Sequence, residues 1–201
     1  PPFGGVEEDG TETNFPSKFR TKETADLFLA LIIKMVKDGG RCAVVLPDGT
    51  LFGDGVKSRI KEELMEKCNL HTIVRLPLGV FNPYTNINTN ILFFEKGTPT
   101  KEIWYYQHKH PVGVKNYNKT KPINIKEFDV EKEWWNNRVE NDVAWKVSLD
   151  DIKARDYNLD IKNPKDQDQK ELEASKVILD RLHSNNKVVD GLLMKIKEIL
   201  N

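Results

Sequence analysis

The amino-acid sequence predicts an α/β fold, the second half of a doubly wound sheet followed by a helical tail. Two stretches, residues 21–38 and 56–68, repeat apolar side chains at the spacing of amphipathic helices. Short apolar runs alternate with them, and these runs are continuous, as in strands buried on both faces. The strand and glycine-rich turn that open such a sheet do not precede the first helix. We therefore expect the C-terminal half of the sheet.

Residues 1–20 lack a hydrophobic period and are predicted to form a long loop. The first helix, residues 21–38, follows. The hydroxyl groups of Thr21 and Thr24 are candidates for capping its start, and Gly39 with Gly40 supplies its end. Its apolar face consists of Ala25, Phe28, Leu29, Ile32, Ile33 and Val36.

Residues 42–46 form the first predicted strand, which ends at Pro47, Asp48 and Gly49. The second helix, residues 56–68, directs three apolar side chains inward: Ile60, Leu64 and Met65.

Further strands are predicted at residues 71–76, 90–94 and 103–106, the last reached through a turn at residues 97–99. Short links between helices and strands favour a sheet that is parallel at first and is then closed by a hairpin. The loop of that hairpin is residues 77–90.

After residue 109 the sequence becomes polar and rich in turns. Short helices are predicted at residues 128–135 and 149–154, and short extended pieces at 144–147 and 157–160. These elements are expected to complete the same domain.

The tail after Asn163 and Pro164 is charged and helical. Its apolar residues recur in alternating steps of three and four, the spacing of a heptad stripe, interrupted by Ser175 and Asn186. The polar stretch at residues 183–186 leaves open whether the tail is one helix or two. The stripe consists of Leu172, Leu179, Leu182, Val189, Leu193, Ile196 and Leu200.

Lysine plus arginine and aspartate plus glutamate each number 31, so the formal net charge is zero. A protein that binds DNA through phosphate contacts alone is usually basic. Any contact with DNA is therefore expected to be local or shared with a partner.

The remaining composition indicates a cytoplasmic protein. Cys42 and Cys68 form no CxxC pair and are expected to be buried thiols in a reducing compartment. His108 and His110 lack a third ligand, so no metal site is predicted. No apolar run approaches the ~20 residues that span a bilayer, which argues against a membrane protein. The chain opens on Pro1 without an initiator methionine, which suggests a fragment or a processed product.

Pro1-Pro2-Phe3 resembles the last three positions of the tetrapeptide of amino-methyltransferases, in which Asn or Asp precedes two prolines and an aromatic residue. The preceding side-chain oxygen and the carbonyl of Pro1 would accept hydrogen bonds from the exocyclic amino group of adenine. They would hold this weak nucleophile against the methyl donor. Phe3 would stack on the base, which must be flipped out of the duplex.

Longer segments resemble the modification subunit of type I restriction–modification systems, an adenine-N6 DNA methylase. They are residues 26–29, 39–47, 49–52, 89–97 and 155–160. The resemblance spans residues 1 to about 161. It implies a Rossmann-like, S-adenosylmethionine-dependent methyltransferase domain at 1–161, and a tail at 162–201 for subunit assembly.

The same resemblance implies duplex DNA as substrate, N6-methyladenine as product, and a specificity subunit and a restriction subunit as partners. It places the family's donor-binding glycine motif and catalytic Asn before Pro1. The chain alone is therefore expected to be inactive.

The loop at residues 77–90 would lie beside the site, and the resemblance favours Phe81, Asn82 and Tyr84 as lining for the base pocket. An ordinary hairpin turn, with Asn and Pro chosen for geometry, is the alternative. Asp48 follows the end of a buried strand, where α/β sheets place ligand-binding groups. It is equally explained as a turn residue before Gly49.

Two other functions are consistent with the sequence. The Pro-Pro-aromatic motif also suits a methyltransferase that acts on a protein glutamine or on RNA. From a different class, the chain could be a non-catalytic assembly module in which the tail binds the specificity subunit and the α/β part is scaffold.

Overall fold

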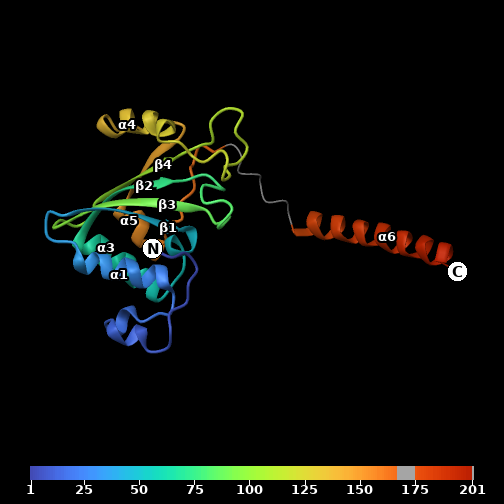
Figure 1. The fold of residues 1–201 in the computed structure, drawn as a ribbon, viewed down its shortest axis with the longest axis horizontal. Coiled ribbons are helices and arrows are strands. Elements are labelled where there is room, and N and C mark those ends of the chain that lie inside the picture. The colour runs from blue at the N-terminus through green and yellow to red at the C-terminus, as the bar shows by residue number, and fades with distance from the viewer. Residues whose placement is uncertain (167–174, 201) are drawn as a thin grey trace. The chain divides into compact units, whose positions relative to one another are not determined.

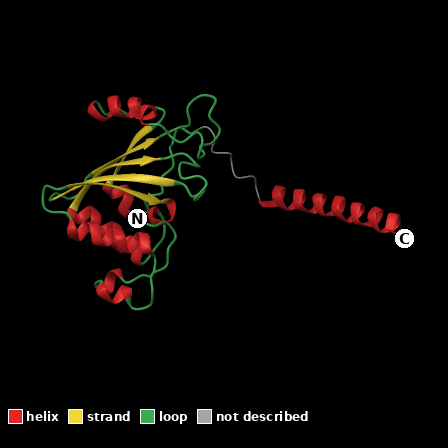
Figure 2. Ribbon diagram, in the orientation of Figure 1, coloured by secondary structure: helices red, strands yellow, loops and turns green. Residues whose placement is uncertain are grey.

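The computed structural model describes residues 1–166 and 175–200. The chain forms two compact units, Pro1–Lys165 and Asp166–Asn201. In the first unit a twisted sheet is covered by α1 and α3 on one face and by α4 on the other (Figure 1; Figure 2). The predicted α/β class is confirmed.

The described sheet has five strands in the order β1-β3-β2-β4-β5. They are β1 (Arg41–Pro47), β2 (Cys68–Arg75), β3 (Thr89–Lys96), β4 (Glu102–Gln107) and β5 (Ala144–Ser148). β3 is antiparallel to both β1 and β2, β4 is parallel to β2, and β5 is antiparallel to β4.

The strand order corrects one part of the predicted sheet. β1 and β2 share a direction but are not neighbours, because β3 lies between them. Leu92 and Phe94 of β3 are among the most deeply buried side chains, as expected for an apolar strand that is paired on both sides. The predicted hairpin is confirmed, because β2 and β3 are antiparallel neighbours joined through the loop predicted at residues 77–90. Since β3 is paired on both sides, β4 pairs with β2.

Helices α1 (Thr24–Met35) and α3 (Val56–Lys67) pack on one face of the sheet, and Ile60, Leu64 and Met65 are buried there as predicted. The predicted cap at Thr24 is wrong, because Thr24 is already the first helical residue. Of the two hydroxyl groups, that of Thr21 makes a hydrogen bond just before the helix, where it accepts from the N–H of Glu23 at 3.2 Å.

The opposite face is covered by α4 (Asp129–Asn136), which follows the short 3-10 turn η3 (Ile125–Phe128). Trp134 is buried against Trp104 and Tyr106. The sheet therefore has an apolar core on each face.

After α5 (Leu149–Lys153) the chain turns back over the sheet. The predicted extended piece at residues 157–160 is wrong at its start, because Tyr157 adopts the left-handed conformation with φ 56°. Leu159 then donates its N–H to the carbonyl of Leu51 at 2.9 Å. The Tyr105 hydroxyl donates to the carbonyl of Leu159 at 3.1 Å. These bonds tie the returning segment to the sheet.

The second unit contains α6 (Ser175–Leu200), a single continuous helix, so residues 183–186 do not divide it. Leu179, Leu182, Val189 and Leu193 are each more than half exposed. Leu172, the first residue of the predicted stripe, lies outside the described residues.

Cys42 is half-buried and Cys68 is buried, and both thiols are free. Burial raises the pKa of each thiol, which makes them weak nucleophiles.

Candidate active site at the carboxyl edge of the sheet

The ends of β1 and β2 and the start of β3 meet at one edge of the sheet, here called the carboxyl edge. Asp48 directly follows β1, Arg75 ends β2, and Asn90 is the second residue of β3. The topology therefore brings together three polar side chains that are distant in sequence. This is the edge at which α/β sheets bind their ligands.

Asp48 and Asn90 are hydrogen-bonded to each other. The side-chain amide of Asn90 donates from Nδ2 to Oδ1 of Asp48 at 2.6 Å. The backbone N–H of Asp48 donates to the carbonyl of Asn88 at 3.0 Å. Asp48 is thus held by one bond to the loop that precedes β3 and by one bond to β3 itself.

Arg75 connects this pair to the returning segment. Its Nη2 lies 3.8 Å from Oδ1 of Asp48 and donates to Oδ1 of Asp160 at 2.7 Å. Its Nη1 donates to the carbonyl of Ile161 at 3.1 Å. One planar guanidinium therefore hydrogen-bonds a carboxylate and a backbone carbonyl, and it lies within ion-pair distance of a second carboxylate.

These charges lie largely out of water, since the Arg75, Asp48 and Asp160 side chains are 12%, 18% and 22% exposed. Burial alone would raise the pKa of Asp160. The hydrogen bonds and positive charges of Arg75 and Lys162 outweigh that effect and hold the pKa of Asp160 below its ordinary value. The carboxyl group of Asp160 is therefore ionised at neutral pH.

Two oxygen atoms at the carboxyl edge have no hydrogen-bond partner among the described residues. They are Oγ1 of Thr89 and Oδ1 of Asn90, and both residues are almost completely buried. Leaving a buried acceptor unpaired costs about 1–3 kcal/mol. The carboxyl edge thus retains two hydrogen-bond acceptors whose hydrogen-bond donor is not supplied by the described residues.

An aromatic pair lies at the loop of the same edge. The rings of Phe3 and Phe81 are 5.4 Å apart between centroids, with their planes at 77°. This edge-to-face arrangement is the one that aromatic quadrupoles favour. It brings the N-terminal segment against the loop between β2 and β3.

The loop that carries Phe81 is held by backbone and side-chain bonds. Asn82 donates its N–H to the carbonyl of Gly79 at 3.0 Å, and its Nδ2 donates to the carbonyl of Tyr117 at 3.4 Å. The peptide bond between Asn82 and Pro83 is cis. Tyr84 is 86% exposed, so its ring is free to contact a ligand but packs on little of the protein.

A buried lysine, Lys61, holds the short helix that begins at Asp48. Asp48 begins the short helix α2 (Asp48–Leu51), and Nζ of Lys61 donates to the carbonyl of Leu51 at 2.7 Å, close to the end of that helix. Lys61 is 1% exposed, and burial lowers its pKa to about 8. Its ammonium group contributes to the position of α2 and hence of Asp48.

The candidates from the sequence fall into two groups. Phe3 is in contact with Phe81, whereas Pro1 and Pro2 are exposed. Asp48 is bonded to Asn90 rather than to any of the loop candidates. The sequence reasoning missed Asn90, Arg75 and Asp160 as members of this edge. The available signal for Arg75 was a charged residue that interrupts the apolar residues of the strand predicted at 71–76.

The described residues contain no group of three or more histidine, cysteine, aspartate or glutamate side chains that could hold a metal ion. Within the same ranges, no helix is long and apolar enough to cross a membrane.

A family model described as N-6 DNA Methylase matches residues 1–173. The chain belongs to this family. Among curated relatives, it is 66% identical over 171 residues to the methylase subunit of the Escherichia coli type I restriction enzyme EcoEI, covering 82% of this chain and 35% of that protein. Over 115 residues it is 39% identical to the EcoKI methylase subunit of Escherichia coli K12, covering 53% of this chain and 21% of the relative.

Solved structures agree with this membership. A modification subunit of a putative type I restriction enzyme from Vibrio vulnificus YJ016 aligns with a TM-score of 0.78 and 52% identity, over 82% of this chain and 37% of that one. The EcoKI M protein aligns with a TM-score of 0.67 and 27% identity, over 81% and 41%. The resemblance to type I modification subunits and the methyltransferase fold are confirmed. This N-6 DNA methylase chain spans about a fifth to a third of the curated relatives it matches.

Proposed function

We propose that this chain provides the base-binding edge of a site-specific adenine-N6 DNA methyltransferase, the modification subunit of a type I restriction system. The observation that carries the proposal is Phe3 packed on Phe81 at the carboxyl edge, in a chain of the N-6 DNA methylase family. We assign the base-contacting roles to Pro1, Pro2 and Phe3. The assigned lining of the pocket is Phe81, Asn82, Tyr84 and Asp48.

In the proposed reaction the flipped adenine stacks on Phe3, and Phe81 holds that ring from its edge. Stacking contributes roughly 1–3 kcal/mol, which offsets much of the few kcal/mol needed to unstack the base. The carbonyl of Pro1 accepts a hydrogen bond from the exocyclic amino group and aims its lone pair. As nitrogen bonds to the methyl carbon, the methyl–sulfur bond breaks, and the amino nitrogen then releases a proton.

S-adenosylmethionine, when bound, supplies the electrophilic methyl group for this reaction. The carboxyl edge offers aromatic, amide and carboxylate groups, including the unpaired Oδ1 of Asn90, which suit a purine base. The resemblance places the family's donor-binding glycine motif before Pro1 and not among the described residues at this edge. We therefore assign none of them to donor binding, and we propose no metal. The proposed compartment is the cytoplasm.

The proposed partners are duplex DNA, a specificity subunit and a restriction subunit. A net charge of zero supports recognition of the DNA sequence by a partner rather than by this chain. A structure titled as the assembly of a type I restriction–modification system aligns with the whole chain at a TM-score of 0.79 and 35% identity. We propose that the exposed leucines of α6 dock on the specificity subunit.

The test measures methyl transfer to DNA by the whole modification subunit that carries this chain, with its specificity subunit. Phe3→Ala should lower the rate by roughly ten- to a hundredfold, since it removes the stacking term. It should also abolish the rise in 2-aminopurine fluorescence that reports base flipping at the target. The exposed Phe28 of α1, changed to alanine, is the matched control.

Unchanged transfer in Phe3→Ala would contradict the assignment. Transfer to RNA or to a glutamine peptide, and not to DNA, would favour the related amino-methyltransferases. Specificity-subunit binding without any transfer by the whole subunit would favour an assembly module. The isolated chain should show no transfer.

A further inference from the structure

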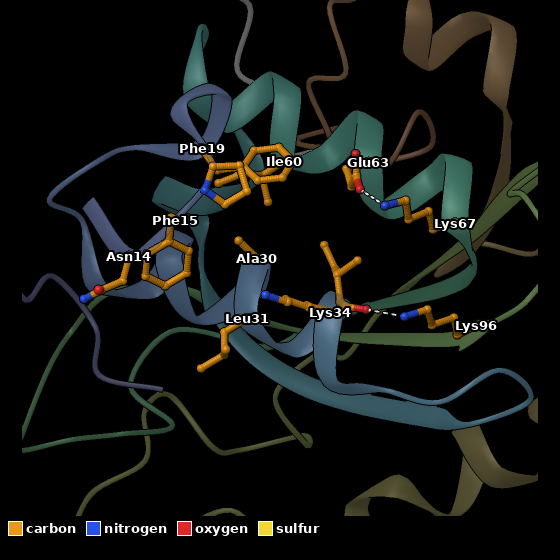
Figure 3. Close-up of a pocket in the computed structure, with 12 residues that line it drawn as sticks. Asn14, Phe15, Phe19, Ala30, Leu31, Lys34, Ile60, Glu63, Lys67 and Lys96 are labelled. Carbon is orange, nitrogen blue, oxygen red and sulfur yellow. Dashed lines mark hydrogen bonds and ion pairs between the residues drawn. The ribbon is translucent and has the colours of Figure 1, made fainter. Parts of the chain in front are cut away.

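A cavity of about 420 Å³ lies on the helical side of the sheet, between the N-terminal segment and helices α1 and α3 (Figure 3). The proposed active site does not use it. Phe15 and Phe19 lie on one side of it and Leu31 of α1 on another, as Figure 3 shows. The lining comprises Asn14, Phe15, Pro16, Phe19, Ala30, Leu31, Ile33, Lys34, Ile60, Glu63, Lys67 and Lys96.

Most of the lining is apolar. Phe19 and Ile60 are buried side chains of the main core, and Leu31 is 39% exposed at the opening. Small-ligand cavities typically measure about 300–1,000 Å³ and combine apolar walls with a few polar groups. The size and chemistry of this cavity match that description.

The cavity lining holds more positive than negative side chains, and Figure 3 shows the Lys34 side chain directed toward Leu31, apart from Lys67 and Lys96. Glu63 is the one carboxylate of the lining, and it is already paired with Lys67 and with Lys18, whose Nζ lies 2.7 Å from Oε2. Nζ of Lys96 donates to the carbonyl of Ile33 at 2.9 Å. Lys34 has no ion pair among the described residues. The lining therefore carries a net positive charge and one ammonium group that is available to a ligand.

The cavity lies away from the carboxyl edge. Lys96 ends β3, and the start of that strand, Thr89, is at the carboxyl edge; Lys67 ends α3, at the beginning of β2. The cavity is thus at the opposite edge of the sheet. An inference about it stands independently of the proposed methyltransferase function.

We propose that this cavity binds an amphipathic carboxylate. Its aliphatic chain lies among Phe15, Phe19, Leu31 and Ile60, and its carboxylate lies at Lys34. The apolar walls bury the aliphatic chain, and the ammonium group of Lys34 selects an anionic head group over a neutral one.

The test titrates the 201-residue chain with decanoate below its micellar concentration, and with the neutral decanol, by calorimetry. Decanoate should bind more tightly than decanol. Lys34→Glu should weaken decanoate by about three- to tenfold, as expected for reversing one solvent-accessible charge, and change decanol less than twofold. Lys37→Glu makes the same charge change at an exposed lysine outside the lining, so it should leave both affinities unchanged.

Ala30→Trp fills the cavity from α1 and should abolish binding of both compounds, with folding checked by circular dichroism. Absence of decanoate binding to the unaltered chain would overturn the proposal. Equal affinities for decanoate in the Lys34→Glu and Lys37→Glu proteins would also overturn it, because the charge would then not select the ligand. This comparison does not depend on Ala30→Trp being folded.

Discussion

The ring of Phe81 is proposed to act on methyl transfer through Phe3. It contacts the Phe3 ring edge to face and makes no hydrogen bond to it. An aromatic pair of this geometry contributes about 0.5–1.5 kcal/mol beyond its buried area. Phe81→Leu keeps the loop apolar but removes the edge contact. In the whole modification subunit we expect about two- to tenfold slower methyl transfer.

Single-turnover kinetics distinguishes this effect from weaker DNA binding, since the pair acts after the base is flipped. Phe28→Leu, on the exposed side of α1, is the control. An equal loss in both proteins would show that the change reflects general destabilisation.

Lys61 makes the stability of the fold depend on pH. Its pKa is lowered from 10.5 to about 8 by burial, so between these values the unfolded chain holds a proton that the folded chain has lost. The free energy of unfolding should therefore rise with pH from 8 to 10, by roughly 2 kcal/mol. Urea denaturation at several pH values measures this slope.

Lys61→Met should remove the rise in the free energy of unfolding between pH 8 and 10, whatever its effect on stability at pH 7. An opposing contribution begins near pH 9, because burial raises the pKa of the Cys42 and Cys68 thiols, and it grows above pH 10, because burial raises the pKa of Tyr106 to about 12. If the slope from pH 8 to 10 is the same with and without Lys61, the buried ammonium is not its source.

Residue types at the site could be predicted from the sequence, whereas their pairings could not. Phe3 and Phe81 were both candidates, since stacking on a base requires an aromatic ring. Their contact depends on how the N-terminal segment crosses the sheet, which no local pattern encodes. Arg75 and Asp160 form an ion pair across 85 residues, and neither shows a periodic signal.

At the scale of elements, the positions of strands and helices follow from local spacing, and most were predicted to within a few residues. The partners of each strand were not. A continuous apolar run such as residues 90–94 fits any central place in a sheet. The position of β3 between β1 and β2 is decided only when the strands compete for burial.

The loop between β2 and β3 depends on Gly79. This residue has φ +86°, and an added Cβ would lie 1.9 Å from Oδ1 of Asn116. Gly79→Ala should therefore destabilise the fold by about 1–3 kcal/mol, through both backbone strain and displacement of Asn116. Chemical denaturation measures the loss.

Gly113 provides a matched comparison, with φ +84° and nothing within 4 Å of an added Cβ. Gly113→Ala carries the strain alone and should cost less than Gly79→Ala. Equal losses in the two variants would show that Asn116 moves aside freely, and that packing between the two loops is weak.

At the scale of the molecule, the first unit continues to Lys165. Asn163 is 3% exposed, and its Nδ2 donates to Oε1 of Gln107 at 3.0 Å and to the carbonyl of Asp142 at 2.7 Å. The resemblance placed the boundary near residue 161, and the charged, helical character of the sequence after Pro164 agreed with it. An amide that caps two distant segments gives no signal of its own in a sequence.

A chain ending at Lys165 should keep the thermal stability of the whole chain to within about 3 °C, because α6 belongs to a separate unit. In the whole modification subunit, the same deletion should abolish co-purification with the specificity subunit. Retained co-purification would place the docking surface on the first unit. A large fall in the melting temperature would show that the two units stabilise each other.

A pulling force applied to the C-terminal tail would also act on the hydrogen bonds of the Arg75 guanidinium. The chain leaves the first unit after Lys165, so a load on the tail meets the anchored Asn163 first and then Asp160 and Ile161, which Arg75 holds at 2.7 Å and 3.1 Å. Tension arriving from α6 therefore reaches this clamp, and through it Asp48, before it can shear a β-strand. Pulling a single molecule by its C-terminus should give a first rupture at low force, when the clamp at the carboxyl edge opens while the sheet remains intact.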